Sequence, residues 1–435
     1  MNLHKTVQRA LRSLVMVSLC GVAFTAVAET PAVPDETVKQ LPLEELRLFA
    51  EVYERIKNAY VEPVDDAKLL QDAVRGMLAG LDPHSNYMDK EEFEALQVHT
   101  SGEFGGLGIE VGMEEPYIRV ITPIDDTPAE RAGVKAGDLI TQLDDKPVAS
   151  MSLEEAINHM RGEPGEPIVL TILREGRDKP IEITVVRDII HVASVKSRII
   201  EPGYGYIRIT QFQVNTGKEL VKQLATLQED GSLNGLVLDL RNNPGGVLQA
   251  AVDVGNAFLS QGTIVYTEGR LPNSDQLFEA NSQTAMPELP MVVLINGGSA
   301  SASEIVAGAL QDQKRAVIMG TDSFGKGSVQ TILPLAKDRA IKLTTARYFT
   351  PNGRSIQAQG IAPDIEVGNA ELKPLGNGGS NLKERDLSGH LENGQTDTDA
   401  KDKRAEEREL LREDFQLFEA VALLKALSIV KLQDQ

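Results

Sequence analysis

The spacing of apolar residues predicts two helices near the start of the chain. In LEELRLFAEVYERIKNAYV (43–61) and KLLQDAVRGMLAGLD (68–82), apolar residues return every three or four positions, and the second segment ends at a Gly followed by Leu-Asp-Pro. We therefore expect a helical N-terminal region over residues 29–98. Its apolar stripe is a candidate dimerisation surface.

Short strand patterns come next. A Gly-rich stretch, SGEFGGLGIEVG (101–112), leads into the strand-like segments YIRVITPI, LITQLDDKPV and IVLTILREG, and the helix pattern SLEEAINHMRG lies among them. Short strands around one or two helices are typical of a compact module of about 90 residues. We place this module at residues 99–186.

From residue 187 to 369, strand and helix patterns alternate. Buried-strand runs such as GLVLDL (235–240) and MVVLI (291–295) are interleaved with helix patterns such as TGKELVKQLATLQ and SEIVAGALQD. This alternation predicts an α/β fold, in which helices cover a sheet. Residues 370–404 are polar and Gly-rich, which predicts a flexible linker. The last region, 405–435, is a helix pattern whose apolar face, LFEAVALLKAL, needs a partner and is a candidate oligomerisation surface.

Residues 1–28 have the pattern of an export signal. Three basic residues precede an apolar run, and the small residues Ala26-Val27-Ala28 close the segment. The apolar run is shorter than the roughly 20 residues that span a bilayer, which favours cleavage after about Ala28 over an uncleaved anchor. A lipoprotein would use Cys20, but the bulky Leu19 stands where a small residue is preferred.

Cleavage after Ala28 has two chemical consequences. Cys20 is the only cysteine, so the mature chain has no disulfide framework and no thiol nucleophile. Removal of three basic residues changes the formal net charge from −20 to −23. This acidity disfavours nucleic acid and anionic membrane surfaces as partners.

A candidate nucleophile lies where the strand MVVLI passes into a helix through NGGSASASE (296–304). A residue in such a turn exposes its side chain beside the free N–H groups of the helix N-terminus. Small neighbours let a substrate carbonyl approach, and the N–H groups can stabilise an oxyanion. Ser299, Ser301 and Ser303 all fit this pattern, and helix capping or packing is the alternative for each.

A serine nucleophile needs a base, and the sequence contains no histidine between His191 and His390. Lys326, in DSFGKGSVQT, is the best local candidate because its flanking glycines allow close backbone approach. Desolvation would have to lower its pKa well below the usual value of about 10.4. Gln330, four residues later, returns to the same side of a strand or a helix, and its amide can hold the amine without adding charge.

These segments together resemble the C-terminal processing peptidases, also called tail-specific proteases. The resemblance rests on five motifs, which follow the family order between about residues 45 and 367: LDPHSNYM, FGGLGIEV, LDLRNNPGG, GGSASASEIVAGALQD and SFGKGSVQ. It implies an α/β core of the ββα serine-protease type, an inserted PDZ domain, and flanking helical N- and C-terminal regions. It also implies that neither a cofactor nor a metal is needed.

The family pattern assigns roles to individual residues. It makes Ser301 the nucleophile, Lys326 the base and Gln330 the partner of the lysine. It takes the oxyanion donors from the backbone N–H groups of Ala302 and Gly245. In the same LDLRNNPGG motif we interpret Asp239 and Arg241 as a structural pair and place Asn243 near the site.

The FGGLGIEV motif resembles the carboxylate-binding loop of a PDZ domain, in which backbone N–H groups hold the C-terminal carboxylate of a peptide that adds as a strand. Leu107, Gly108 and Ile109 supply those N–H groups in this interpretation. The helix SLEEAINHMRG forms the other wall, with an apolar pocket made by Leu153, Ile157 and Met160. A Gly-rich hairpin is the alternative, and a phosphate loop is disfavoured because no strand-loop-helix frame surrounds the motif. His84 and His99 are interpreted as structural.

The resemblance implies a periplasmic serine endopeptidase that cleaves proteins with exposed apolar C-termini, which the PDZ domain recognises or gates. Association of the enzyme with the membrane stays open. A lipoprotein adaptor and peptidoglycan-hydrolase substrates are the partners expected on the same ground, whereas a homo-oligomer is expected from the apolar faces of the two helical end regions. Two other function classes stay open. One is a catalytically latent PDZ scaffold that needs an adaptor. The other is an acyl-CoA enzyme of the hydratase-isomerase class, which needs neither a PDZ domain nor an export signal.

Overall fold

The computed structural model describes residues 42–177, 179–229, 231–281, 286, 288–335, 338–370, 388 and 414–433. The predicted export signal (1–28) lies outside these residues, as do nearly all of the predicted linker and the first part of the predicted C-terminal region. The chain divides into two units, one ending at Leu70 and the other beginning at Gln71.

The first unit contains α1 (Leu43–Ala59) and the start of α2 (Asp66–Ala79). Both helices were predicted from the apolar spacing. No residue of α1 is buried, and its apolar residues Leu46, Phe49, Val52 and Ile56 form an exposed stripe. The stripe arises because positions three or four apart share one face of a helix.

The region predicted as helical to residue 98 also holds a strand, which the periodicity did not indicate. β1 (Asn86–Met88) pairs antiparallel with β18 (Arg339–Phe349). α3 (Lys90–Ser101) then begins at a capping box of Asp89 and Glu92 and ends at Gly102, whose φ of +74° favours glycine. The helix therefore extends past the predicted boundary.

The module predicted at 99–186 contains an antiparallel sheet in the order β3-β4-β5-β7-β8, and β6 pairs with β5. The helices α4 and α5 accompany the sheet, and the core between them includes Ile118, Ile140, Ala156 and Leu170. The elements are β3 (Ile109–Glu114), β4 (Tyr117–Pro123), α4 (Pro128–Arg131), β5 (Leu139–Leu143), β6 (Lys146–Pro147), α5 (Leu153–Met160), β7 (Pro167–Leu173) and β8 (Ile181–Val186).

A separate two-stranded ribbon brackets this module in sequence. β2 (Glu103–Gly106) precedes the module and pairs antiparallel with β9 (Asp188–His191), which follows it. The chain therefore enters and leaves the module through neighbouring strands.

The region predicted as α/β is built on a six-stranded sheet, in which β11 to β19 run parallel and β10 pairs antiparallel with β11. The order is β10 (Val195–Glu201), β11 (Tyr204–Ile209), β12 (Gly235–Asp239), β15 (Met291–Ile295), β16 (Val317–Gly320) and β19 (Ile365–Glu366).

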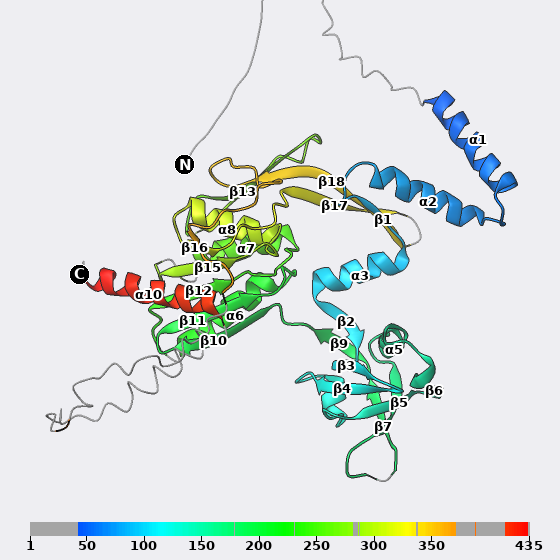
Figure 1. The fold of residues 1–435 in the computed structure, drawn as a ribbon, viewed down its shortest axis with the longest axis horizontal. Helices are drawn as coiled ribbons and strands as arrows, with labels where there is room; N and C mark the ends of the chain where they lie inside the picture. The colour runs from blue at the N-terminus through cyan, green and yellow to red at the C-terminus, as the bar shows by residue number, and fades with distance from the viewer. Residues whose placement is uncertain are drawn as a thin grey trace, which may run out of the picture. The chain divides into compact units, whose positions relative to one another are not determined.

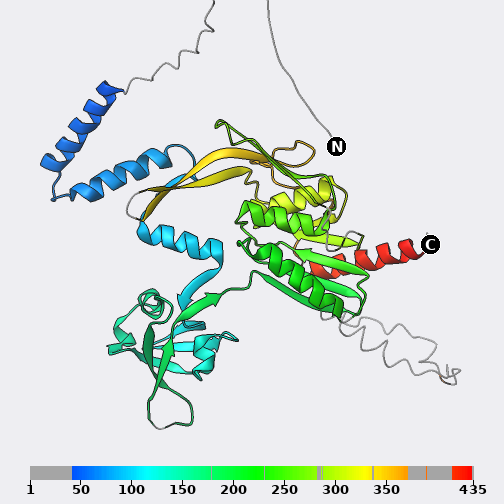
Figure 2. The same ribbon diagram turned by 180° about the vertical axis from the view of Figure 1, so that it is seen from behind.

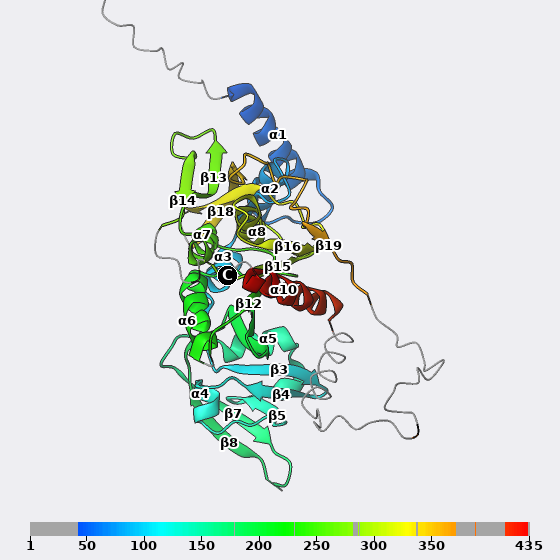
Figure 3. The ribbon, with the colours of Figure 1, turned by 90° about the vertical axis from the view of Figure 1, so that its left-hand side faces the viewer.

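Helices cover both faces of this sheet (Figures 1 and 3). On one face, Leu236 and Leu238 of β12 pack in the same cluster as α6 (Thr216–Glu229), α7 (Leu248–Phe258) and α8 (Ala302–Asp312). On the other, Val237 packs in a cluster with Leu417, Ala420, Val421 and Leu424 of α10 (Phe415–Gln433). Successive side chains of a strand point to opposite faces, which explains why β12 is apolar throughout.

The sheet therefore supplies the partner that the apolar face of the C-terminal helix required. In the described part of the chain, no helix is both long and apolar enough to cross a bilayer.

A second sheet has the order β1-β18-β13-β14, and β17 pairs with β18. Its remaining strands are β13 (Thr263–Gly269), β14 (Gln276–Glu279) and β17 (Ser328–Leu335). Figure 2 shows β17 and β18, in yellow, as a long twisted pair. The register shifts between Val329 and Gln330, which marks a local irregularity immediately before Gln330.

Candidate active site

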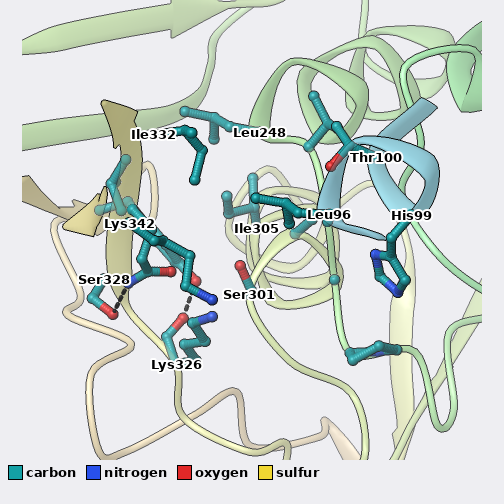
Figure 4. Close-up of a pocket in the computed structure, with 18 residues that line it drawn as sticks. Leu96, His99, Thr100, Leu248, Ser301, Ile305, Lys326, Ser328, Ile332 and Lys342 are labelled. Atoms are coloured by element: carbon teal, nitrogen blue, oxygen red, sulfur yellow. Dashed lines mark hydrogen bonds between the residues drawn. The ribbon is translucent and has the colours of Figure 1, made fainter. Parts of the chain in front are cut away.

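A cavity of about 400 Å³ brings together three segments that the sequence separates widely (Figure 4). Ser301 and Ala302 enter it from the start of α8, Gly245 from the loop after β12, and Lys326 and Gln330 from the loop before β17 and from β17 itself. The five core residues that the family pattern assigned therefore line one cavity.

Ser301 occupies a tight turn between β15 and α8. Its φ of +56° and ψ of −112° lie outside the regions that residues other than glycine usually adopt. Such a conformation costs on the order of 1–3 kcal/mol and persists only where the surrounding structure enforces it. The turn presents the serine hydroxyl to the cavity, beside the N-terminus of a helix.

Hydrogen bonds distinguish the three candidate serines. The hydroxyls of Ser299 and Ser303 are buried and donate to the carbonyl oxygens of Leu240 and Asn243, at 2.8 Å and 2.9 Å. Both therefore fasten the turn to the neighbouring loop. Ser301 is the serine of the motif that lines the cavity.

Glu304, which was not predicted from the sequence, fixes the backbone of the turn at Ser301 through hydrogen bonds. Its fully buried carboxylate accepts the backbone N–H of Ser301 at 2.7 Å and that of Lys326 at 2.9 Å. It also accepts the Gly325 N–H and the Ser323 hydroxyl, both at 2.6 Å. One carboxylate thus ties the serine turn to the lysine loop. The spacing of Ser301 and Glu304 matches a capping box, a signal that could have identified it.

Lys326 is half-buried at the wall of the cavity. Burial lowers the pKa of its amine, the nearby Lys342 cation lowers this pKa further, and the carboxylates of Glu304 and Asp82 oppose the shift. The hydroxyl of Tyr348 donates to the Lys326 carbonyl oxygen and fixes the backbone there. The lowered pKa is the direction that a basic lysine requires.

Lys342 also lines the cavity and was not predicted (Figure 4). It comes from β18, whereas Lys326 precedes β17, so the antiparallel pairing of these strands brings the two cations into one cavity. No sequence motif relates the two lysines. Only the pairing of β17 with β18 shows that the two lysines share a cavity.

Gln330 lines the same cavity, but its hydrogen bonds lead elsewhere. Its Nε2 donates to Ser328 Oγ at 2.9 Å and to Thr344 Oγ1 at 3.4 Å. Thr344 Oγ1 in turn donates to Asp82 of the LDPHSNYM motif at 3.2 Å. Among the described residues no hydrogen bond joins Gln330 to Lys326, so the predicted amide-amine contact is absent from this conformation.

Gly245 approaches Ser301 closely from the LDLRNNPGG motif. Its φ is +98°, and a Cβ atom there would lie 2.7 Å from Ser301 Cβ and 2.9 Å from the Ala302 nitrogen. Only glycine fits this position. The Gly245 N–H, predicted as an oxyanion donor, here donates to Asn243 Oδ1 at 2.9 Å.

The two histidines interpreted as structural both lie near this region. His99 lines the cavity, and its carbonyl oxygen accepts Gln211 Nε2 at 2.5 Å. Burial and the Lys326 cation lower the pKa of His84. Among the described residues no group of His, Cys, Asp and Glu could hold a metal ion.

A second cavity, of about 190 Å³, lies in the 99–186 module between the Gly-rich loop and α5. The predicted residues that line it are Leu107, Gly108, Ile109, Ile157 and Met160. Leu153 is not among the residues that line this cavity, although it packs against the hydrophobic core of the module as Ile157 does. Phe104, Val111 and Arg161 line the cavity and were not predicted. β3 is an edge strand of its sheet, so it can accept a further strand.

Family models match three parts of the chain: peptidase family S41 over residues 203–367, a PDZ domain over residues 105–185, and the N-terminal domain of activating protease CtpB over residues 22–92. A carboxy-terminal-processing protease of Bartonella bacilliformis is 48% identical over 390 residues, which cover 89% of this chain and 90% of the relative. The chain belongs to peptidase family S41.

Other curated relatives agree with this assignment of the S41 peptidase. The carboxyl-terminal-processing protease of Synechocystis is 39% identical over 320 residues, covering 72% of this chain and 74% of the relative. That of Picosynechococcus is 36% identical over 384 residues, covering 84% and 91%.

The predicted fold class is thereby confirmed: this S41 peptidase, of the C-terminal processing type, combines an α/β protease core with a PDZ domain and helical end regions. The hydratase-isomerase alternative loses its support, because the chain matches proteases over most of its length.

Proposed function

We propose that this S41 peptidase is a carboxyl-terminal processing serine endopeptidase that uses Ser301 as nucleophile, Lys326 as general base and Gln330 as the partner of the lysine. One observation carries the proposal. A strained serine at a helix N-terminus shares a cavity with a half-buried lysine whose pKa is lowered by burial and by a second cation. This is the combination that activates a hydroxyl nucleophile without histidine.

The reaction begins when the neutral Lys326 amine takes the proton of the Ser301 hydroxyl and the oxygen attacks the substrate carbonyl carbon. The Ala302 and Gly245 N–H groups donate to the oxyanion. Lys326 then passes the proton to the leaving amine as the peptide bond breaks, which leaves an acyl-enzyme. A water molecule gives a proton to Lys326 and attacks the ester, and Ser301 regains its proton when the acid product leaves.

Two contacts must change for this cycle to run. The Gly245 N–H must leave Asn243 Oδ1, and Gln330 must turn from Ser328 towards Lys326. These contacts support the alternative that the described conformation is a latent one, which substrate or an adaptor converts to the active arrangement. In that case the isolated chain is a PDZ protein whose protease activity appears only with a partner.

The PDZ cavity suggests how substrates are chosen. Its lining is apolar apart from Arg161, it lies beside the Gly-rich loop, and it borders the edge strand β3. A peptide with an apolar C-terminal residue can add to β3 and place that side chain against Ile157 and Met160. Proteins with exposed apolar C-termini are therefore the proposed substrates, which the PDZ domain recognises or gates.

The predicted export signal supports a proposal for the location, and the resemblance to the C-terminal processing peptidases supports one for the partners. We infer a periplasmic enzyme, cleaved after about Ala28, that cuts peptidoglycan hydrolases with the help of a lipoprotein adaptor. The stripe formed by Leu46, Phe49, Val52 and Ile56 supports assembly of a homo-oligomer. Fractionation of cells that produce the full chain, with N-terminal sequencing of the periplasmic form, tests the location.

The direct test of activity is cleavage of an unfolded protein by the chain from Glu29 onward, beside Ser301→Ala and Lys326→Ala, with cut sites read by mass spectrometry. Loss of cleavage in both variants supports the proposal, whereas equal cleavage by all three proteins contradicts it. If none of the three cuts, the assay is repeated with periplasmic extract, which separates a latent enzyme from an inactive scaffold.

A further inference from the structure

The loop from Arg241 to Gly246 determines where Gly245 lies relative to Ser301. Three of its residues have positive φ angles: Asn242 at +54°, Gly245 at +98° and Gly246 at +144°. Its middle is held by Asn243, whose Nδ2 donates to the Ile209 carbonyl oxygen and whose own carbonyl oxygen accepts the Ala300 N–H and the Ser303 hydroxyl. The conformation of the loop therefore depends on these bonds and on what fixes its two ends. At the far end of the loop, the Phe212 N–H donates to the Gly245 carbonyl oxygen, and the Phe212 carbonyl oxygen accepts the Val247 N–H. At the near end of the loop, the side chain of Arg241 is held by neighbouring groups.

The Arg241 side chain is 11% exposed and lies between two carboxylates. Its guanidinium donates to Asp239 at 2.6 Å and 3.0 Å, and Asp239 belongs to the strand that precedes the loop. It also makes a two-point contact with Asp414, at 2.6 Å and 2.9 Å. Paired N–H donors that face a carboxylate in this way fix the orientation of the guanidinium plane as well as its position.

Asp414 belongs to the other end of the chain. It stands at the start of α10, where its Oδ1 also accepts the Leu417 N–H at 3.0 Å. Gln416, one of the first residues of α10, adds a further contact, because its Oε1 accepts Arg241 Nη1 at 3.0 Å. The N-terminal end of α10 thus grips the residue from which the Gly245 loop departs.

The charges in this cluster balance. Asp239 is fully buried and also accepts from Arg208 at 3.2 Å, so two guanidinium groups face two carboxylates. Burial acts against the charge of Arg241, but its bonds to Asp414 and Asp239 outweigh burial and raise its pKa. Loss of the Asp414 charge leaves an excess positive charge in a mostly buried place, where water cannot compensate it fully.

We propose that Asp414 is a positioning residue for the protease site: by holding Arg241, the docked helix α10 keeps the Gly245 loop in place against Ser301. The inference rests on the proposed function, because it gives Gly245 a role in binding the oxyanion once its N–H has turned away from Asn243 Oδ1. Arg241 and Asp414 keep the loop close to Ser301 while that local change takes place. It makes the activity of the core depend on a helix that lies on the opposite face of the sheet from α8 (Figure 3).

The test compares Asp414→Asn with Lys425→Gln in the chain from Glu29 onward. The control removes a different ion pair of α10, in which Lys425 contacts Glu201 at 2.8 Å. Lys425 lies in the middle of α10, whereas Asp414 stands at the start of the helix. We expect Asp414→Asn to lower kcat by about tenfold with KM unchanged, since a misplaced oxyanion donor affects the transition state rather than substrate binding. Lys425→Gln should keep the wild-type kcat. Asp414→Glu, which retains the charge, should recover part of the loss.

Hydrogen exchange of the amides of residues 241–246 gives a second measurement that needs no activity. We expect faster exchange in Asp414→Asn than in Lys425→Gln at matched overall stability. Equal kcat and equal exchange in the two variants would overturn the inference and leave α10 as a general stabiliser. If the wild-type chain cleaves no substrate even with periplasmic extract, the proposed function fails, and the exchange comparison alone then decides whether Asp414 positions the loop.

Discussion

The carboxylate of Glu304 accepts the backbone N–H of Ser301 at 2.7 Å, from within the first turn of the helix that the serine precedes. The same carboxylate accepts three further donors, all of them from the loop that carries Lys326. The proposed nucleophile and base are thus fixed by one buried group, although neither side chain contacts it through its reactive atom in these bonds. Glu304 is therefore a positioning residue, and its replacement should displace both Ser301 and Lys326.

Replacement of Glu304 by Gln should reduce stability and activity together. The amide can accept at only one of its two ends, so at least one buried backbone N–H faces an NH₂ group. An unpaired buried donor costs about 1–3 kcal/mol, and we expect a loss of about 2–4 kcal/mol when the charge is included. Urea unfolding measures this loss, and kcat should fall more than tenfold.

Glu219→Gln is the matched control for this variant. Glu219 also accepts a backbone N–H and a hydroxyl, both from Ser194, but it does not line the cavity. It should lower stability and leave kcat near the wild-type value. A Glu304→Gln enzyme with normal kcat at a temperature where it is folded would contradict the positioning role.

Replacement of Lys342 by Met should change the pH dependence of cleavage. The Lys342 cation helps to lower the pKa of Lys326, so its removal raises that pKa towards the ordinary value of 10.5. Because Lys326 must be neutral to accept the serine proton, the acid limb of the kcat/KM profile should move to higher pH. Arg347→Met, an exposed residue of the same strand, removes an equal charge outside the cavity and should leave the limb in place.

Replacement of Lys326 by Met should stabilise the folded protein at neutral pH while it abolishes activity. Folding lowers the pKa of Lys326, so between the folded pKa and 10.5 the unfolded chain binds more protons than the folded one. The wild-type protein therefore loses stability as the pH falls through this window, and the Met variant does not. Thermal unfolding from pH 7 to pH 10 should show the advantage of Lys326→Met shrinking as the pH rises; a constant difference would argue against the lowered pKa.

Replacement of Gly245 by Ala should abolish cleavage, because the new Cβ would meet Ser301 Cβ at 2.7 Å and the Ala302 nitrogen at 2.9 Å. The positive φ adds strain of about 1–3 kcal/mol. Gly165→Ala separates the two effects, since Gly165 has a similar φ of +94° and a Cβ added there would meet no atom within 4 Å. That control should lose stability alone. Activity in Gly245→Ala above a tenth of the wild-type value would show that the loop can retreat without harm.

Replacement of Ile157 by Asn should weaken binding of peptides with a free, apolar C-terminus. The residue lines the PDZ cavity, so a polar side chain there leaves the C-terminal side chain of the peptide without an apolar partner. Fluorescence anisotropy should show a Kd raised about tenfold, for a loss of roughly 1.4 kcal/mol. Asn158→Ala, on the exposed face of the same helix, should not change it. Equal binding of the amidated peptide would place recognition elsewhere.

Much of the fold and the site follows from local sequence pattern. The helices of the first unit, the apolar strands β12 and β15 and the serine turn at Ser301 were predicted because each depends on residues close together in the chain. The contacts that were missed join distant segments. The pairing of β17 with β18 brings Lys342 to the cavity. The ion pair between Arg241 and Asp414 joins a loop of the protease core to the C-terminal helix α10, which is distant in sequence.

Leu153 shows the same limit on a smaller scale. Leu153 and Ile157 both pack against the core of the module, and only the three-dimensional packing shows that Ile157 lines the cavity while Leu153 does not. The strand β1 was missed for a related reason. Three residues are too few for a periodic signal, and pairing with β18 alone makes them a strand.

The pairing of β1 with β18 also sets the order in which the protein can be built. Met88 lies opposite Ala340, and the whole PDZ domain is synthesised between them. At typical rates of about 5–20 residues per second, β1 waits roughly tens of seconds for its partner strand. The PDZ domain, whose strands pair with near neighbours, can fold during that interval. Assembly of the protease sheet is therefore a late event, and the nascent chain must carry an unpaired β1 strand until then.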